Sequence, residues 1–313
     1  MPRGKFDGFG GNVRRINLWL ALTIAAAPWL SGCADGIADL SSTAQSDTTD
    51  MSAHPNTTGA GAALLSAFYG LDDAIPFLAS YRICREFGHQ DGMPVIFSKE
   101  VDINTLEAGD FRVTLADGQT VTPGCVTPAP AEDIGEFRTI LTIGDFGSIN
   151  NQPRTVTITG NIISLDQQTN FAGAEVSVTA LEDGPTLVLA ESVAQDQWEL
   201  NKESSGLPFG GGTGCPTGTK QIVRAVWAGG VTKPGGDDID DTERAAYKVF
   251  VADSDGGETV VTPMAIGDLG DGDNNHKLCL DVETPATRIA FPENLMTDPR
   301  EDLNPATSVV VTR

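Results

Sequence analysis

The chain has 313 residues, of which 40% are hydrophobic, a composition and length that suit a packed core in one or two domains. It carries 43 acidic and 20 basic residues, a formal net charge of −23. This balance excludes charge-driven binding to nucleic acid or to an anionic lipid surface, because both depend on clustered Lys and Arg.

The first element is a targeting segment. Four basic residues precede an apolar run at 16–30, which ends in Leu30-Ser31-Gly32-Cys33. The run is shorter than the ~20 residues that span a bilayer and has the length of a signal-peptide core. Small residues just before Cys33 suit a cleavage that leaves this thiol at the new N-terminus. An ordinary secretory signal, or a short membrane anchor with an incidental Cys, is the alternative.

The LSGC sequence resembles the lipobox of bacterial lipoproteins. The resemblance implies a signal peptide over 1–32 and a diacylglycerol, often with an added palmitate-type acyl chain, on Cys33. Several acyl chains on one residue give stable membrane anchoring. Ala34 indicates the outer membrane, by analogy with the Gram-negative sorting rule. We therefore expect a lipid-anchored protein of the cell envelope. It would lie on either the periplasmic or the surface side of the outer membrane.

Residues 33–65 are expected to form a flexible tether. Ser, Thr, Asp, Gly and Ala dominate from Ala34 to Gly61, and aromatic residues are absent there. Such a stretch buries too little apolar area to offset its conformational entropy. Removal of 1–32 leaves 16 basic and 42 acidic residues, so the mature chain has a net charge of −26. Beyond Cys33, no apolar run is long enough to cross a bilayer.

The rest of the chain has the pattern of an all-β protein. Short segments rich in Val, Ile, Thr and Phe, several of them alternating with polar residues, predict half-buried strands. These strands are expected at 95–98, 111–115, 137–143, 154–162, 174–181, 220–228, 246–252, 258–266, 277–282 and 307–312. Only Ala60–Tyr69 suits a short helix. A Gly/Ser/Pro-rich segment at 197–218 indicates a boundary near 205, with β-sandwich domains over 66–204 and 205–313.

The segment Pro94–Pro123 resembles the opening of the bacterial Ig-like domains found in surface proteins. The matching residues are Val95, Phe97, Ser98, Val101, Asp102, Thr105, Leu106, Phe111 and Val113. The resemblance implies an Ig-like sandwich over about 75–190 that acts as a spacer or interaction module, not as an enzyme. The expected fold class is therefore all-β, with two Ig-like β-sandwich domains after the lipoprotein signal and tether.

The second domain has the pattern of a diverged copy of the first. Phe111–Pro123 and Tyr247–Pro263 both read as strand, Asp/Gly turn, strand and Pro, with an insertion in the second. This parallel favours an internal repeat; the alternative is coincidence, because strand-turn-strand units are common in β proteins.

Four cysteines remain after Cys33. An even number in an exported chain predicts two disulfides, with three possible pairings. In each half, one Cys precedes the matched strands and one follows them, which favours Cys84–Cys125 and Cys215–Cys279. A metal site or a redox pair is the alternative, although the chain has no Cys-x-x-Cys.

One polar segment has the pattern of a Ca²⁺ loop, since hard cations prefer carboxylate and carbonyl oxygens. Its candidate ligands are Asp268, Asp271, Asp273 and Asn275. His276 and Val282 stand where an EF-hand has Gly and Glu, and a second acidic cluster at 237–241 is expected to lie nearby. The alternative is a solvated Asx-rich loop. No other cofactor is expected.

No catalytic motif is present, so we expect a non-catalytic binding or structural module. Its partner would be an envelope protein or a glycan. A Ca²⁺-dependent glycan-binding or adhesion module is the first alternative, with Trp198 and Trp227 as candidate stacking residues. An unrecognised envelope hydrolase is the second, and it requires a cleft that combines His276 with Asp residues of 268–281.

Overall fold

The computed structural model describes residues 61–75, 84, 87–204, 211–253 and 255–313. The expected signal peptide, the lipidated Cys33 and residues 33–60 of the expected tether lie outside these ranges. Residues 64 and 65, also assigned to the tether, belong to the first strand. No helix in the described ranges is both long and apolar enough to cross a membrane.

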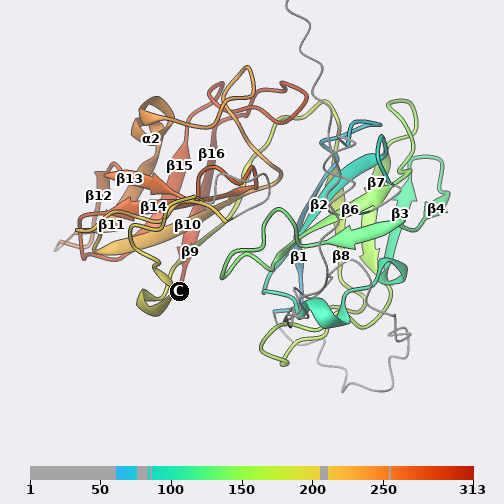
Figure 1. Cartoon of the computed structure of the whole chain (residues 1–313), viewed down its shortest axis with the longest axis horizontal. Coiled ribbons are helices and arrows are strands. Elements are labelled where there is room, and N and C mark those ends of the chain that lie inside the picture. The colour runs from blue at the N-terminus through green and yellow to red at the C-terminus, as the bar shows by residue number, and fades with distance from the viewer. Residues whose placement is uncertain (1–60, 76–83, 85–86, 205–210, 254) are drawn as a thin grey trace, which may run out of the picture. The chain divides into compact units, whose positions relative to one another are not determined.

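Eight strands form the first repeat (Figure 1). They are β1 (Leu64–Phe68), β2 (Asp91–Phe97), β3 (Phe111–Leu115), β4 (Thr120–Val121), β5 (Cys125–Thr127), β6 (Thr139–Gly144), β7 (Pro153–Ile158) and β8 (Glu175–Thr179). Their order in the sheet is β4-β3-β7-β8-β1-β2-β6-β5. Two short 3-10 helices, η1 (Ile103–Thr105) and η2 (Ala108–Asp110), precede β3.

The strand β8 divides this ladder into two layers. Its first part pairs antiparallel with β7, and its last two residues pair parallel with β1. Side chains from both parts of the ladder then enclose one core, which includes Val95 of β2, Val113 of β3 and Val156 of β7. The first repeat is therefore a β-sandwich whose last strand is shared by both layers.

The second repeat has the same architecture. Its strands are β9 (Leu187–Ser192), β10 (Gln221–Trp227), β11 (Lys248–Ala252), β12 (Glu258–Val261), β13 (Ala265–Gly267), β14 (Asn275–Leu280), β15 (Ala286–Phe291) and β16 (Thr307–Thr312). Their order, β12-β11-β15-β16-β9-β10-β14-β13, is that of the first repeat with eight added to each number. Like β8, β16 pairs antiparallel with one neighbour and parallel with the other. The predicted all-β class with two β-sandwiches is confirmed.

Equivalent positions in the two repeats carry related core residues. The pairing registers align Phe97 with Trp227, and the parallel noted in the sequence aligns Phe111 with Tyr247. In the first core, the rings of Phe97 and Phe111 meet edge to face at 6.3 Å. In the second, the ring of Phe291 packs against those of Trp227 and Tyr247, with ring centroids 5.3 and 4.6 Å apart. The repeat therefore extends to the aromatic packing that stabilises each core.

Several elements differ from the sequence expectations. Ala60–Tyr69 contains a strand, β1, because Ala67 and Phe68 are buried between β2 and β8, and this tertiary environment outweighs local propensity. The expected strand 258–266 is two strands, β12 and β13, separated at Pro263. The structure adds β9, β15 and the short helix α2 (Asp241–Ala246), which Asp240 and Glu243 cap reciprocally.

The position of β9 bears on the domain boundary. This strand, at 187–192, pairs with β10 and β16 and is a central strand of the second sheet. The second sheet therefore begins on the N-terminal side of residue 205, where the sequence places the boundary. The 3-10 helix η3 (Gln195–Gln197) follows β9 and precedes β10, so it lies within the second repeat.

Both disulfides have the pairing favoured by the sequence, Cys84–Cys125 and Cys215–Cys279. Their Cα atoms are 6.1 and 5.7 Å apart, distances ordinary for a disulfide. The first bridge joins the segment before β2 to β5, the edge strand of its sheet, and the second joins the segment before β10 to β14, the strand next to β10. Cys125 lies on β5 opposite Ile143, whereas Cys279 lies on β14 opposite Ala265. The two bridges thus end at the same cross-strand residue pair of the repeat, but on opposite members of that pair.

Candidate cation site at the junction of the two repeats

A row of three charged side chains crosses the sheet of the second repeat. Arg224 of β10 lies opposite Glu191 of β9 on one side and opposite Lys277 of β14 on the other. At the equivalent of Arg224 and Lys277, the first repeat has Pro94 and Leu141. Two like charges opposite each other destabilise a sheet unless anions compensate them. The second repeat therefore needs acidic partners that the first does not.

The loop between β5 and β6, residues 128–138, supplies partners for Arg224. The guanidinium donates to the carbonyl oxygens of Ile134 at 2.6 Å and Gly135 at 2.8 Å, and to Glu191 at 2.9 Å. Gly135 has a φ of +91°, and a Cβ there would lie 2.1 Å from Arg224 Nη1. Glu191 also accepts from Arg138 at 2.7 Å. Charged groups of the two repeats are therefore paired across a buried junction.

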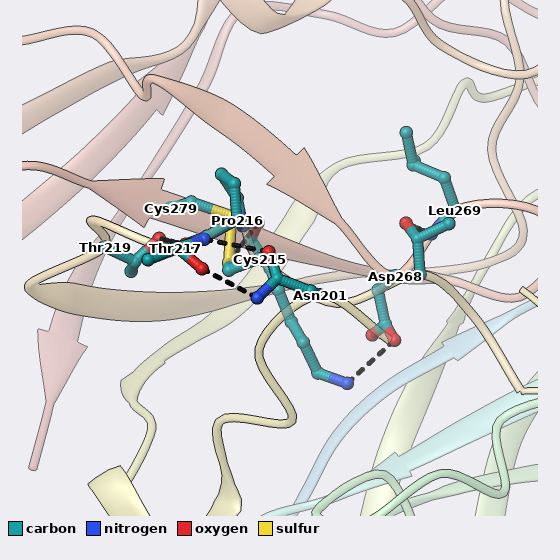
Figure 2. The surroundings of a disulfide bond; sticks show 10 residues. Asn201, Cys215, Pro216, Thr217, Thr219, Asp268, Leu269 and Cys279 are labelled. Atoms are coloured by element: carbon teal, nitrogen blue, oxygen red, sulfur yellow. Dashed lines mark hydrogen bonds and ion pairs between the residues drawn. A yellow bond between two sulfur atoms is a disulfide. The ribbon is translucent and has the colours of Figure 1, made fainter. Parts of the chain in front are cut away.

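Lys277 is almost fully buried, and it contacts two carboxylates. Its Nζ lies 2.8 Å from Asp268 Oδ1 and 3.7 Å from Glu136 Oε1. Figure 2 shows the bond to Asp268, together with the nearby Cys215–Cys279 bridge. Asp268 belongs to the loop between β13 and β14, residues 268–274, which occupies the place in its repeat that the β5–β6 loop occupies in the other. The two equivalent loops thus supply carboxylates to one site.

The structure separates the four predicted Ca²⁺ ligands into two pairs. Asp273 and Asn275 bond to each other, because the backbone and side-chain nitrogens of Asn275 donate to the carboxylate at 2.8 and 2.9 Å. Asp268 and Asp271 instead lie beside Asp133 of the β5–β6 loop, with one oxygen of each within 4.8 Å of the others. All four predicted residues are buried, so the loop is not the solvated one considered as the alternative.

The second acidic cluster contacts this loop at one point. Asp238 Oδ2 accepts from the backbone N–H of Gly270 at 2.9 Å. Asp240 instead caps α2 and pairs with Lys233, and Asp241 pairs with Arg244. The cluster therefore supports the loop and the helix.

Burial and mutual repulsion disfavour the charged forms of the acids in this cluster. Burial, together with Asp268 and Asp133, raises the pKa of Asp271 to about 7. The same causes, burial first and then neighbouring carboxylates, raise the pKa of Asp273 and of Glu136 well above their ordinary values. Burial works against the charge of Arg224, but Glu136 and Glu191 outweigh it, so its pKa is raised. The site has an excess of negative charge.

His276 lies in the core of the second repeat, where it neighbours Lys277 along β14 but bonds to a different partner. Its Nδ1 lies 2.8 Å from the hydroxyl of Tyr247, which accepts a bond of 2.8 Å from Trp227 Nε1. Burial lowers the pKa of His276 to about 4, so the ring is neutral near neutral pH. Trp227 is fully buried and unable to stack on a sugar, while Trp198 is half-buried and donates to the carbonyl of Val193. The placement of His276 weighs against a hydrolase site that combines this residue with the Asp residues of 268–281. The burial of Trp227 weighs against sugar binding by stacking on its ring.

We expect Tyr247→Phe to lower the free energy of unfolding by about 1–3 kcal/mol, because it leaves Trp227 Nε1 and His276 buried without their partner. Urea denaturation monitored by tryptophan fluorescence measures the loss. Tyr69→Phe is the matched control, since this buried hydroxyl lies beside two carboxylates, Asp72 at 3.4 Å and Asp91, and links no pair of buried rings in the described residues. Equal losses in the two variants would show that the network contributes nothing specific.

An apolar cavity of about 430 Å³ lies beside the junction. It is lined by residues of both repeats, among them Phe68, Pro94, Pro130, Leu141, Gly230 and Pro299. Pro94 and Leu141 are the positions that the second repeat replaces with Arg224 and Lys277. A cavity of this size and polarity suits a small apolar ligand or a side chain of a partner.

Two basic residues of the junction could have been noticed in the sequence, because each interrupts an apolar strand segment. Arg224 stands within the apolar run IVRAVW, and Lys277 within NHKLCL, a strand that is buried along its whole length. A charge inside a buried strand requires a partner. No comparable signal marks Asp133 or Glu136, which lie in an ordinary polar loop.

Comparisons with known proteins assign no family to the chain. No family model matches it, and no curated protein does. Among solved structures, it is similar to native alpha-2-macroglobulin from Escherichia coli, in a structure spanning domains MG0-NIE-MG1. That similarity has 13% identity and a TM-score of 0.26, and it covers 82% of this chain and 73% of the other. At so low a TM-score, nothing about function follows from the likeness.

Proposed function

We propose that this protein is a lipid-anchored, non-catalytic structural or binding module of the cell envelope. The observation that carries the proposal is the duplicated sandwich in which each repeat is closed by its own disulfide. Disulfides persist in oxidising compartments outside the cytosol, which agrees with the lipobox at Cys33. The buried ion pair of Arg138 with Glu191, and the bonds that Arg224 donates to the carbonyl oxygens of the β5–β6 loop, join the two repeats into one body. Such a body suits a spacer or a docking platform.

The anchor is tested by expressing the full-length chain in a bacterium that matures lipoproteins, with an alkyne-tagged fatty acid in the medium. We expect the wild-type chain to incorporate the label and to sediment with membranes, because Cys33 is its acceptor. Cys33→Ser should lose the label and stay as an unprocessed precursor. Ser31→Thr is the control, since it alters a neighbouring residue but keeps the thiol. Labelling of Cys33→Ser would refute the lipid anchor.

The binding role is tested by cross-linking the wild-type protein in intact cells and identifying what is captured. A module of the proposed kind should yield a small set of envelope proteins, and an Arg224→Ala variant with a loosened junction should alter that set. Capture of glycan alone would favour the adhesion alternative. Turnover of envelope polymers by the purified chain would overturn the non-catalytic role.

A further inference from the structure

Three carboxylates from the two repeats converge on one point. Asp133 comes from the β5–β6 loop, and Asp268 and Asp271 come from the β13–β14 loop. One oxygen of each lies within 4.8 Å of an oxygen of the other two. Oxygens that share a Ca²⁺ ion at 2.3–2.6 Å are at most about 5 Å apart. The spacing is thus that of ligands around one ion.

The basic side chains nearby do not balance these carboxylates. Lys202 pairs with Asp133 at 2.8 Å, and Lys277 pairs with Asp268 Oδ1 at 2.8 Å. Among the ion pairs of the described residues, none includes Asp271. The other oxygen of Asp268, Oδ2, is buried and accepts no bond from an N–H or O–H donor within the described part of the chain, and the carboxyl of Glu136 lies close enough to Asp268 to share a proton with it. An unpartnered carboxylate oxygen at such a depth is costly unless a cation or a proton neutralises it.

The backbone also approaches this point closely. The N–H of Gly212 donates to Asp133 Oδ2 at 3.2 Å. A Cβ at Gly212 would lie 2.5 Å from Asp271 Oδ2 and 2.8 Å from the Cα of Asp268. A side chain would therefore push into the space between the carboxylates. This accounts for a glycine here, in a run that the sequence alone suggests is a linker.

We propose that Asp133, Asp268 and Asp271 bind one Ca²⁺ ion, which ties the β5–β6 loop of the first repeat to the β13–β14 loop of the second. Carboxylates on separate loops suit Ca²⁺, which accepts irregular oxygen geometry, better than Mg²⁺, which requires a near-ideal octahedron. The site goes beyond the proposed function and does not depend on the lipid anchor, so either can fail without the other. A proton shared among the carboxylates is the competing occupant.

The test is calorimetric titration of CaCl2 into the EDTA-treated full-length chain in detergent. We expect one ion per chain with a dissociation constant of about 10⁻⁴–10⁻³ M, the range of exported modules. Asp271→Asn and Asp133→Asn should each weaken binding at least ~10-fold, because each removes a charged ligand. Asp281→Asn, an exposed acid just after β14, should bind as the wild type does. No binding heat at 10 mM Ca²⁺ would overturn the proposal, and so would full affinity in Asp271→Asn.

Thermal unfolding separates loss of binding from loss of fold. Without Ca²⁺, Asp271→Asn should melt no lower than the wild type, since it removes an uncompensated buried charge. With Ca²⁺, the wild type should gain several degrees and Asp271→Asn should gain none. Gly212→Ala keeps every ligand and should still weaken binding. Amide exchange at Gly135 and Glu136 should slow with Ca²⁺; unchanged exchange there, or equal stabilisation by Mg²⁺, would contradict a Ca²⁺ tie between the repeats.

Discussion

Arg224→Ala is expected to lower the free energy of unfolding by about 3–5 kcal/mol, because removing one partner of a buried ion pair leaves the others uncompensated. The substitution would leave the carbonyl oxygens of Ile134 and Gly135 without the donor that now contacts them within 3 Å. It would also remove one of the two arginines that pair with Glu191, so that Arg138 remains. The repulsion between Arg224 and Lys277 would be removed as well, but this gain in stability is too small to offset the loss. Equilibrium urea denaturation measures the change from the shift in midpoint.

The matched control is Arg300→Ala. Arg300 makes a 3.4 Å ion pair with Asp302, and both side chains are about one-third exposed. A solvated pair of this kind contributes about 0–1 kcal/mol. A loss below 1 kcal/mol in Arg224→Ala, or an equal loss in the two variants, would contradict a junction stabilised by buried charge.

The second large effect concerns the disulfides. Cys215 and Cys279 are separated by 64 residues, and Cys84 and Cys125 by 41. In the chain-entropy model, a cross-link over either loop contributes roughly 4 kcal/mol. We therefore expect each double Cys→Ser variant to lose about that amount in urea denaturation. A loss under 1 kcal/mol would show that the bridge constrains little in the unfolded chain.

The two bridges should differ in their accessibility to reductant. Cys215 and Cys279 are both fully buried, whereas Cys125 is half-buried. Native-state reduction with increasing dithiothreitol, followed by alkylation and peptide mass mapping, should label Cys84 and Cys125 first. The same titration in denaturing urea is the control, since both bridges should then open together. Earlier labelling of Cys215 would contradict the burial of this bridge.

The strands whose bounds agree with the sequence prediction at both ends are two that have an exposed face. Phe111–Leu115 and Thr307–Thr312 alternate buried and more exposed positions, and the structure has strands with those bounds. β1 and β9 lack an alternation with a period of two: four of the five residues of β1 are buried, and the buried residues of β9 are Leu187 and Ala190, three positions apart. Their polarity follows the packing on both faces, which no local pattern records.

The candidate site was predictable in part. Asp268 and Asp271 stand out as closely spaced acids after a strand, and the structure places them together. Asp273 and Asn275 share that spacing, but β14 begins at Asn275 and turns their side chains toward each other. Asp133 lies 135 positions before Asp268, and its contact with the site arises from the junction alone.

The sequence by itself determined the all-β class and favoured the internal repeat and the observed pairing of the cysteines, because alternation, turn residues and spacing are local or periodic properties. Only the tertiary structure decided that the equivalent loops of the two repeats meet, and that Arg224 and Lys277 lie buried among acids there. The reason is physical. The pattern that specifies the core occurs once in each repeat and can be recognised by comparing the two. The junction instead joins two different faces, one apolar at Pro94 and Leu141 and the other charged at the equivalent positions. Which groups neutralise one another across it depends on contacts between residues far apart in the chain.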